Sequence, residues 1–259
     1  MGGPRVTVQS VVESLDRWLS LEGLDNVRDV GGLPLRDGGH TRPGVLLRSA
    51  SLHYVTPADV QHLIDVIGLK LVLDLRTRRE VDRDGPTAVA QAGVETVWLS
   101  LIAEDGEALP WADTDLDPVL RSYLGYLSDR GENVVRAVRR LAEVDAPALV
   151  HCAAGKDRTG VLVALLLDAV GVRRDAVLAD YVLSADRVPA LFRRWTQAAG
   201  EPMPADLSPH LPRVEVMATV LARLDAEYGS DGSGGASGWL AANGLADETL
   251  ERLRRRFAV

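Results

Sequence analysis

The fold of this chain is decided by the segment Leu149-Val150-His151-Cys152-Ala153-Ala154-Gly155-Lys156-Asp157-Arg158-Thr159-Gly160. A buried strand, expected at 148–152, leads into a short loop of small residues, and an apolar helix is expected at 159–170. Gly155 lets the loop backbone curl, because glycine adopts conformations that other residues avoid. A strand that turns directly into a helix predicts a loop at the carboxyl edge of an α/β sheet, where ligand sites form.

The rest of the sequence continues this alternation of strands and helices. Short apolar segments predict strands at 45–47, 70–75, 94–101, 148–152 and 6–8. Apolar residues at helical spacing predict helices at 58–66, 134–144 and 159–170. From Arg173 onward the patterns are only helical, at 173–184, 188–198, 213–228, 238–243 and 248–257, with a Gly/Ser-rich loop at 229–238. The sequence therefore predicts an α/β fold with a mostly parallel central sheet flanked by helices, and a helical C-terminal part over about 173–259.

The composition is that of a globular chain. Its 259 residues, 46% hydrophobic and 25% charged, with a mean hydropathy of +0.01, suit a single domain over residues 1–259. No apolar run approaches the roughly 20 residues of a membrane span, so no integral membrane segment is expected. The N-terminus shows no secretory signal. We expect a cytoplasmic protein, or one exported without a recognisable signal peptide.

Charge and cysteine content exclude several kinds of site. The net charge of −8 argues against a nucleic-acid partner. The single cysteine, Cys152, excludes an internal disulfide framework and a multi-thiolate metal site. We therefore expect no metal and no cofactor.

The loop after the strand combines the features of an oxyanion site. The free N–H groups and the positive dipole end of the following helix point back into it. A helix N-terminus and nearby cations favour the thiolate of a cysteine, so Cys152 is expected to attack phosphorus and form a cysteinyl-phosphate that water hydrolyses. The guanidinium of Arg158 offers a planar fork to two phosphoryl oxygens. The expected substrate-binding residues are Ala153, Ala154, Gly155, Lys156, Asp157, Arg158 and Thr159.

Thr159 and His151 have narrower expected roles. The hydroxyl of Thr159 is placed to donate to the sulfur and ease its departure in the second step. His151 is expected to orient the loop backbone. The loop is not a nucleotide P-loop, because Gly155-Lys156 is followed by Asp157 where a Ser or Thr would hold magnesium.

These residues resemble the protein tyrosine phosphatase superfamily, whose signature is His-Cys, five residues, then Arg-Ser/Thr. The form of the loop is similar to that of a bacterial tyrosine phosphatase family, the mycobacterial protein tyrosine phosphatase B type. Further segments fit the same family from about residue 21 to the C-terminus, at 26–32, 42–49, 74–80 (with Glu80) and 179–181. The resemblance implies a cysteine-dependent phosphatase for phosphotyrosine, extending to phosphoserine/threonine and phosphoinositides.

The resemblance leaves two candidates for the general acid that protonates the leaving oxygen. In the wider superfamily an aspartate on a loop just after a strand has this role. Here the strand at 94–101 places Glu104 and Asp105 nearest, and Asp105 is the candidate on that loop, within an acidic segment at about 103–118 interpreted as a flap. The other candidate is Asp157, because the phosphate loop also matches the pattern of myotubularin-type lipid phosphatases.

The resemblance also implies roles for residues outside the loop. Lys156 matches a lysine of phosphoinositide phosphatases and favours a substrate with more than one phosphate. Segment 26–32 is expected beside the active site. Structural roles are implied for Arg28 and Asp29 in ion pairs, Asp74 and Arg76 as hydrogen-bonding support of the loop, and Asp180-Tyr181 in a buried hydrogen bond.

Two other classes of function are alternatives to an active phosphatase. A phosphoryl-binding pseudophosphatase would keep the loop without turnover, although such proteins usually lack the Cys or the Arg. An arsenate reductase needs resolving thiols, which a chain with one cysteine does not supply. A sulfurtransferase fits Arg158-Thr159 less well than phosphate does.

Overall fold

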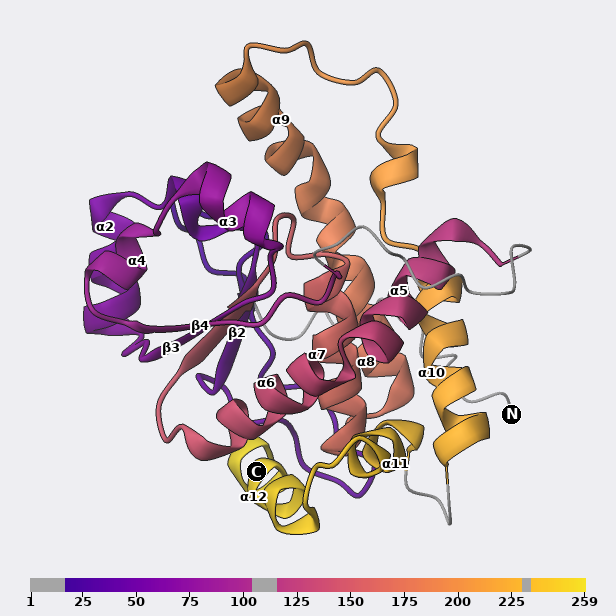
Figure 1. The fold of residues 1–259 in the computed structure, drawn as a ribbon. Coiled ribbons are helices and arrows are strands. Elements are labelled where there is room, and N and C mark those ends of the chain that lie inside the picture. The colour runs from indigo at the N-terminus through magenta and orange to yellow at the C-terminus, as the bar shows by residue number, and fades with distance from the viewer. Residues whose placement is uncertain (1–16, 104–115, 230–233) are drawn as a thin grey trace, which may run out of the picture.

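A five-stranded sheet forms the centre of the computed structural model, which describes residues 17–103, 116–229 and 234–259 (Figure 1). Its strands follow the spatial order β1-β2-β5-β3-β4. They are β1 (Arg28–Asp29), β2 (Leu46–Ser49), β3 (Leu71–Asp74), β4 (Glu95–Trp98) and β5 (Ala148–His151). Strand β1 is antiparallel to β2, and all other pairings are parallel. This confirms the predicted α/β class and puts β5, the strand before the loop, in the middle of the sheet.

Both faces of the sheet are covered, because successive side chains of a strand point to opposite faces. Leu71 and Leu73 of β3 belong to one apolar cluster, together with helix side chains from the second half of the chain. Val72, between them, belongs to a second cluster on the other face. Strand β5 repeats this alternation, with Val150 in the first cluster and Leu149 in the second. Continuous apolar strands are typical of a parallel sheet with two covered faces.

The helices follow one another in three groups. Between β2 and β4 lie η1 (Leu52–Tyr54), α2 (Pro57–Gln61), a π-helical turn η2 (His62–Val66), α3 (Arg78–Asp84) and α4 (Ala88–Gln91). Between β4 and β5 lie α5 (Pro118–Asp129) and α6 (Gly131–Glu143). After β5 come α7 (Arg158–Ala169), α8 (Arg174–Val182), η3 (Leu183–Arg187), α9 (Val188–Ala199), η4 (Ser208–His210), α10 (Val214–Tyr228), α11 (Gly235–Ala242) and α12 (Asp247–Phe257). Within the described residues, no helix is both long and apolar enough to cross a membrane.

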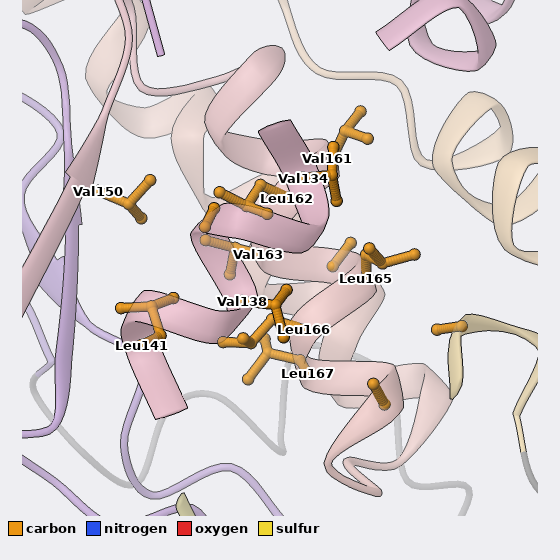
Figure 2. Close-up of a cluster of buried hydrophobic side chains, with 14 of the residues drawn as sticks. Val134, Val138, Leu141, Val150, Val161, Leu162, Val163, Leu165, Leu166 and Leu167 are labelled. Atoms are coloured by element: carbon orange, nitrogen blue, oxygen red, sulfur yellow. The ribbon is translucent and has the colours of Figure 1, made fainter. Parts of the chain in front are cut away.

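Helix α7 is the central helix of the larger core. All of its residues are buried, as its apolar sequence predicts. Figure 2 shows side chains of α7 next to Val134 and Val138 of α6, and it also shows Leu141 of α6 and Val150 of β5, which belong to the same cluster. The C-terminal helices complete this packing, with α11 against α7 and α12 against α6. The helix that starts at the loop after β5 is thus held on several sides.

Several elements differ from the sequence prediction. The strand predicted at 6–8 lies outside the described residues, and β1, which was not predicted, pairs with β2 at the sheet edge. Strand β4 is shorter than the predicted 94–101, and helices α3, α4 and α5 were not predicted. Helix α11 begins at Gly235, inside the predicted Gly/Ser-rich loop. The absence of a side chain there lets α11 approach the backbone of Leu224 on α10.

A buried carboxylate, Asp180 of α8, joins three arginines from the first part of the chain. Its oxygens lie 2.8 Å from Arg17, 3.2 Å from Arg28 and 2.6 Å from Arg48. Arg28 also donates to the Asp180 carbonyl at 2.7 Å. These residues are called the Asp180 cluster below. The cluster connects α8 to β1 and β2, and it includes the ion pair predicted for Arg28.

The electrostatics of this cluster make its members interdependent. Burial on its own would raise the pKa of Asp180, but Arg28, Arg48 and Arg17 hold it well below its ordinary value. Burial lowers the pKa of Arg28 to about 9, with the neighbouring charge of Arg48 adding to the effect. The ion pair predicted for Asp29 is not seen among the described residues. Its carboxylate instead accepts hydrogen bonds from the backbone amides of Gly31 and Gly44 at 2.7 and 2.6 Å.

Replacing Asp180 with Asn is expected to lower the free energy of unfolding by about 3–5 kcal/mol, because it leaves buried guanidinium groups without their counter-charge. Urea unfolding at neutral pH measures this change. Asp175→Asn is the matched control on the same helix, since Asp175 forms an exposed pair with Arg173. It should change the free energy by less than about 0.5 kcal/mol. Equal losses in the two variants would contradict the structural role of the cluster.

Candidate active site

A cavity of about 210 Å³ lies at the carboxyl end of β5. Side chains and backbone of the loop form one part of its wall, from Cys152, Ala153, Ala154, Lys156, Asp157 and Arg158. Helix α9 supplies an apolar part with Leu191, Phe192 and Trp195. Figure 1 shows α9 extending away from the sheet. The predicted nucleophile and the predicted phosphate-binding arginine therefore share one cavity.

The loop is fixed from outside through three successive carbonyl oxygens. Those of Ala153, Ala154 and Gly155 accept hydrogen bonds from the Ser51 amide at 2.9 Å, the Asn26 side chain at 3.0 Å and Arg48 at 2.9 Å. In a planar trans peptide the next N–H points opposite to the carbonyl. The amides of the loop are therefore directed away from these donors, as an oxyanion nest requires.

Gly155 is required at its position in this loop. Its φ of +68° lies in the left-handed region that favours glycine. A Cβ atom there would also overlap the backbone of Ser49 at the end of β2. The loop consequently packs directly on β2, which confirms the expected curl.

Arg158 lies in the first turn of α7, and Glu80 of α3 holds its guanidinium. Its two terminal nitrogens lie 2.6 and 2.9 Å from the two Glu80 oxygens, a bidentate pair. Burial on its own would raise the pKa of Glu80, but the bonds and charge of Arg158, with the amide and hydroxyl of Thr77, lower it to about 2. Thr77 and Glu80 also form the capping box that begins α3. Helix α3 thus presents a fixed carboxylate that orients the guanidinium.

His151, the residue before Cys152, contacts the backbone of the loop. His151 is fully buried, and its Nδ1 lies 3.2 Å from the Cys152 carbonyl oxygen. Its Nε2 lies 3.7 Å from Asp74, yet burial lowers the pKa of the imidazole. Arg76 pairs with Asp74 at 2.7 Å and donates to the Ser51 hydroxyl at 3.3 Å. These contacts agree with the structural roles predicted for His151, Asp74 and Arg76.

Lys156 and Asp157 both face the cavity, and each has a partner outside the loop. The Lys156 ammonium donates to the His210 carbonyl of η4 at 2.7 Å and lies 3.4 Å from Asp157. Asp157 accepts a hydrogen bond of 2.6 Å from the hydroxyl of Tyr123. The cation predicted to select the substrate is thus bound to the C-terminal region. The predicted carboxylate is bound to α5.

The remaining predicted residues divide into two groups. Asp105 and Glu104 lie outside the described residues, so Asp105 stays a prediction. Gly155 and Thr159 are in the loop and the first turn of α7, but they do not line the cavity. The Thr159 hydroxyl is buried and has no hydrogen-bond partner among the described residues. Within the same residues, no group of three His, Cys, Asp or Glu side chains is arranged to hold a metal ion.

The site also contains residues whose roles were not predicted. Glu80 belongs to one of the segments that resemble the family, and the spacing Thr77-x-x-Glu80 is a local signal for the start of a helix. Tyr123 and the apolar residues of α9 carry no such signal. They reach the loop by tertiary packing.

Glu80→Gln is expected to lower the free energy of unfolding by roughly 2 kcal/mol near neutral pH, because the ion pair with Arg158 is lost. The folded-state pKa of Glu80 is depressed, so its contribution is present above its ordinary value of 4.5 and is lost as pH falls through about 2. The difference between wild type and variant should therefore shrink over this interval. Urea unfolding at a series of pH values measures it.

The control for this experiment is Glu95→Gln, which removes an exposed carboxylate paired with Arg140. A loss below about 0.5 kcal/mol is expected there. If Glu80→Gln also lost less than about 0.5 kcal/mol, the ion pair between Glu80 and Arg158 would make no measurable contribution to the free energy of unfolding.

Comparison with known proteins gives consistent matches over most of the chain. Residues 19–259 match the model of a family described as the tyrosine phosphatase family. The triple specificity protein phosphatase PtpB of Mycobacterium tuberculosis is 30% identical, over 90% of this chain and 96% of the relative. A tyrosine-protein phosphatase of Nostoc commune is 28% identical, over 82% of this chain and 73% of the relative. This chain therefore belongs to the tyrosine phosphatase family.

Proposed function

We propose that this cysteine-dependent phosphatase hydrolyses phosphate monoesters through a phosphocysteine intermediate at Cys152. The observation that carries the proposal is one cavity that joins Cys152, a loop with its carbonyls bound from outside, and Arg158 oriented by Glu80. Phosphoryl transfer builds charge on the equatorial oxygens, and fixed donors stabilise that charge. The proposed chemistry needs no metal or cofactor, because side chains supply the nucleophile, the cation and the proton donor.

One carboxyl group donates a proton in the first step of the reaction and accepts a proton in the second. In the first step the sulfur–phosphorus bond forms, the phosphorus–oxygen bond of the ester breaks, and the leaving oxygen takes a proton from the acid. In the second step water attacks the phosphocysteine, the carboxylate accepts a proton, and inorganic phosphate and the thiolate are released. We assign this carboxyl group to Asp157, because it lines the cavity with Cys152. Asp105 is the alternative donor.

The cavity walls support two kinds of substrate. Leu191, Phe192 and Trp195 present an apolar surface that suits the ring of phosphotyrosine. The ammonium of Lys156 suits a further phosphoryl group, as on a phosphoinositide. The name of the M. tuberculosis relative, a triple specificity phosphatase, agrees with a broad range. We therefore propose phosphorylated proteins and phosphoinositides as substrates.

Cys152→Ser is expected to lower turnover of p-nitrophenyl phosphate by at least about 10³-fold, because the serine hydroxyl is a far weaker nucleophile. Binding of inorganic phosphate should persist, since the amides and Arg158 remain. Phosphatase assays and calorimetric titration of phosphate measure the two effects. Equal hydrolysis by the variant would exclude Cys152 as nucleophile.

A second measurement separates an active enzyme from a phosphoryl-binding pseudophosphatase. Cys152 is the only cysteine of the chain, so acid-quenched single turnover followed by mass spectrometry assigns a phosphocysteine without ambiguity. A trapped adduct in wild type supports turnover. Phosphate binding with no adduct would favour the pseudophosphatase.

Lys156→Ala is expected to reduce kcat/KM for bisphosphorylated phosphoinositides by about tenfold, because a charge-assisted contact to the second phosphate is lost. Rates for a phosphotyrosine peptide and a phosphoserine peptide should change less. A panel of these substrates, assayed with wild type and variant, measures the ratio. The matched control is Lys70→Ala, the other lysine of the chain, which is exposed before β3. Unchanged relative rates in Lys156→Ala would remove the proposed role in substrate choice.

A further inference from the structure

A short chain of hydroxyl groups leads from the core to Asp157. The Tyr123 hydroxyl of α5 lies 2.6 Å from Asp157 Oδ1 and 2.8 Å from the Tyr181 hydroxyl of α8. Both tyrosine side chains are buried, and their rings meet edge to face at 6.3 Å. The helices that carry them, α5 and α8, both pack against α7.

Asp157 itself is arranged unusually for its place in the chain. It is the N-cap residue of α7, where an aspartate ordinarily accepts an amide of the first helical turn. Its side chain makes no such bond. Among the described residues, the contacts to its carboxyl group come from Tyr123 and Lys156, and both reach Oδ1. Oδ2 makes no hydrogen bond or ion pair with the described residues, and Asp157 is one of the residues that line the cavity.

We propose that Tyr123 is a positioning residue for the proton donor Asp157. The hydroxyl holds Oδ1 and thereby directs Oδ2 toward the leaving oxygen of the substrate. This inference rests on the proposed function, because it assumes that Asp157 is the acid. Tyr123 does not touch the substrate and acts only through the carboxyl group.

The burial of Tyr123 supports this role. Burial, with the nearby charge of Asp157, raises the pKa of the Tyr123 phenol far above its ordinary value. The phenol therefore stays protonated near neutral pH and can donate a hydrogen bond to the carboxyl group. Tyr181 shares the Tyr123 oxygen, which restricts rotation of the hydroxyl. A rigid donor favours one orientation of the carboxyl group, which proton transfer requires.

The test uses the dependence of rate on the leaving group. A proton donor matters little for p-nitrophenyl phosphate, whose leaving oxygen is weakly basic, and matters more for phenyl phosphate and a phosphoserine peptide. Tyr123→Phe should lower kcat on the last two by about tenfold, with KM and the p-nitrophenyl phosphate rate within about twofold. Asp157→Asn should lower kcat on phenyl phosphate and the phosphoserine peptide further, on the order of 10²-fold, and should again affect p-nitrophenyl phosphate least. Tyr228→Phe on α10 controls for removal of a hydroxyl far from the loop.

The double variant Tyr123→Phe/Asp157→Asn tests whether the tyrosine acts through the aspartate. If it does, the double variant is no slower than Asp157→Asn alone, because the loss is shared. Additive losses, or an equal slowing of every substrate by Tyr123→Phe, would overturn the positioning role and leave the phosphatase assignment intact. A flat leaving-group dependence in Asp157→Asn would remove Asp157 as the acid, and the role of Tyr123 with it.

Discussion

The ion pairs of Asp180 are the interaction on which the rest of the site depends. One buried carboxylate lies between arginines from β1, β2 and the segment before β1. Burial alone would disfavour each of these charges, so they are stable only as a group. Arg48 connects this cluster to the loop after β5, because it binds both Asp180 and the Gly155 carbonyl. The first and second parts of the chain thus meet at this loop.

The pair of Arg158 with Glu80 lies at the end of the loop where α7 begins, and it has a different consequence. Arg48 holds the backbone, whereas Arg158 presents its guanidinium to the cavity while Glu80 fixes it. Both are bidentate or multiply bonded, so neither side chain needs to be reorganised when an anion arrives. Helix α7 connects the two, since it begins at the loop and is buried throughout the core.

The sequence predicted those parts that local patterns determine. The strand, loop and helix around Cys152, and the helical C-terminal part, are confirmed. Strand β1 is not predicted, because its two residues carry no apolar pattern. The charge of the buried Arg28 is compensated by Asp180, which is 152 positions away in the sequence. Helices α3 and α5 had local signals that were not used, Thr77-x-x-Glu80 and Asp117-Pro118. The contact of Tyr123 with Asp157 depends on packing of α5 against α7, which no short motif encodes.

The cavity has two walls with very different attachment to the core. Arg48 of β2 bonds the loop at the Gly155 carbonyl and also pairs with Asp180 of α8, and Arg158, at the end of the loop, pairs with Glu80 of α3. Substitutions in this wall would therefore remove contacts between several elements. Helix α9 extends from the body and buries only Val188 and Leu191. Phe192 and Trp195 can therefore change without loss of the catalytic loop. Divergence of substrate preference among descendants of such a protein would accumulate on α9, while the chemistry stayed fixed.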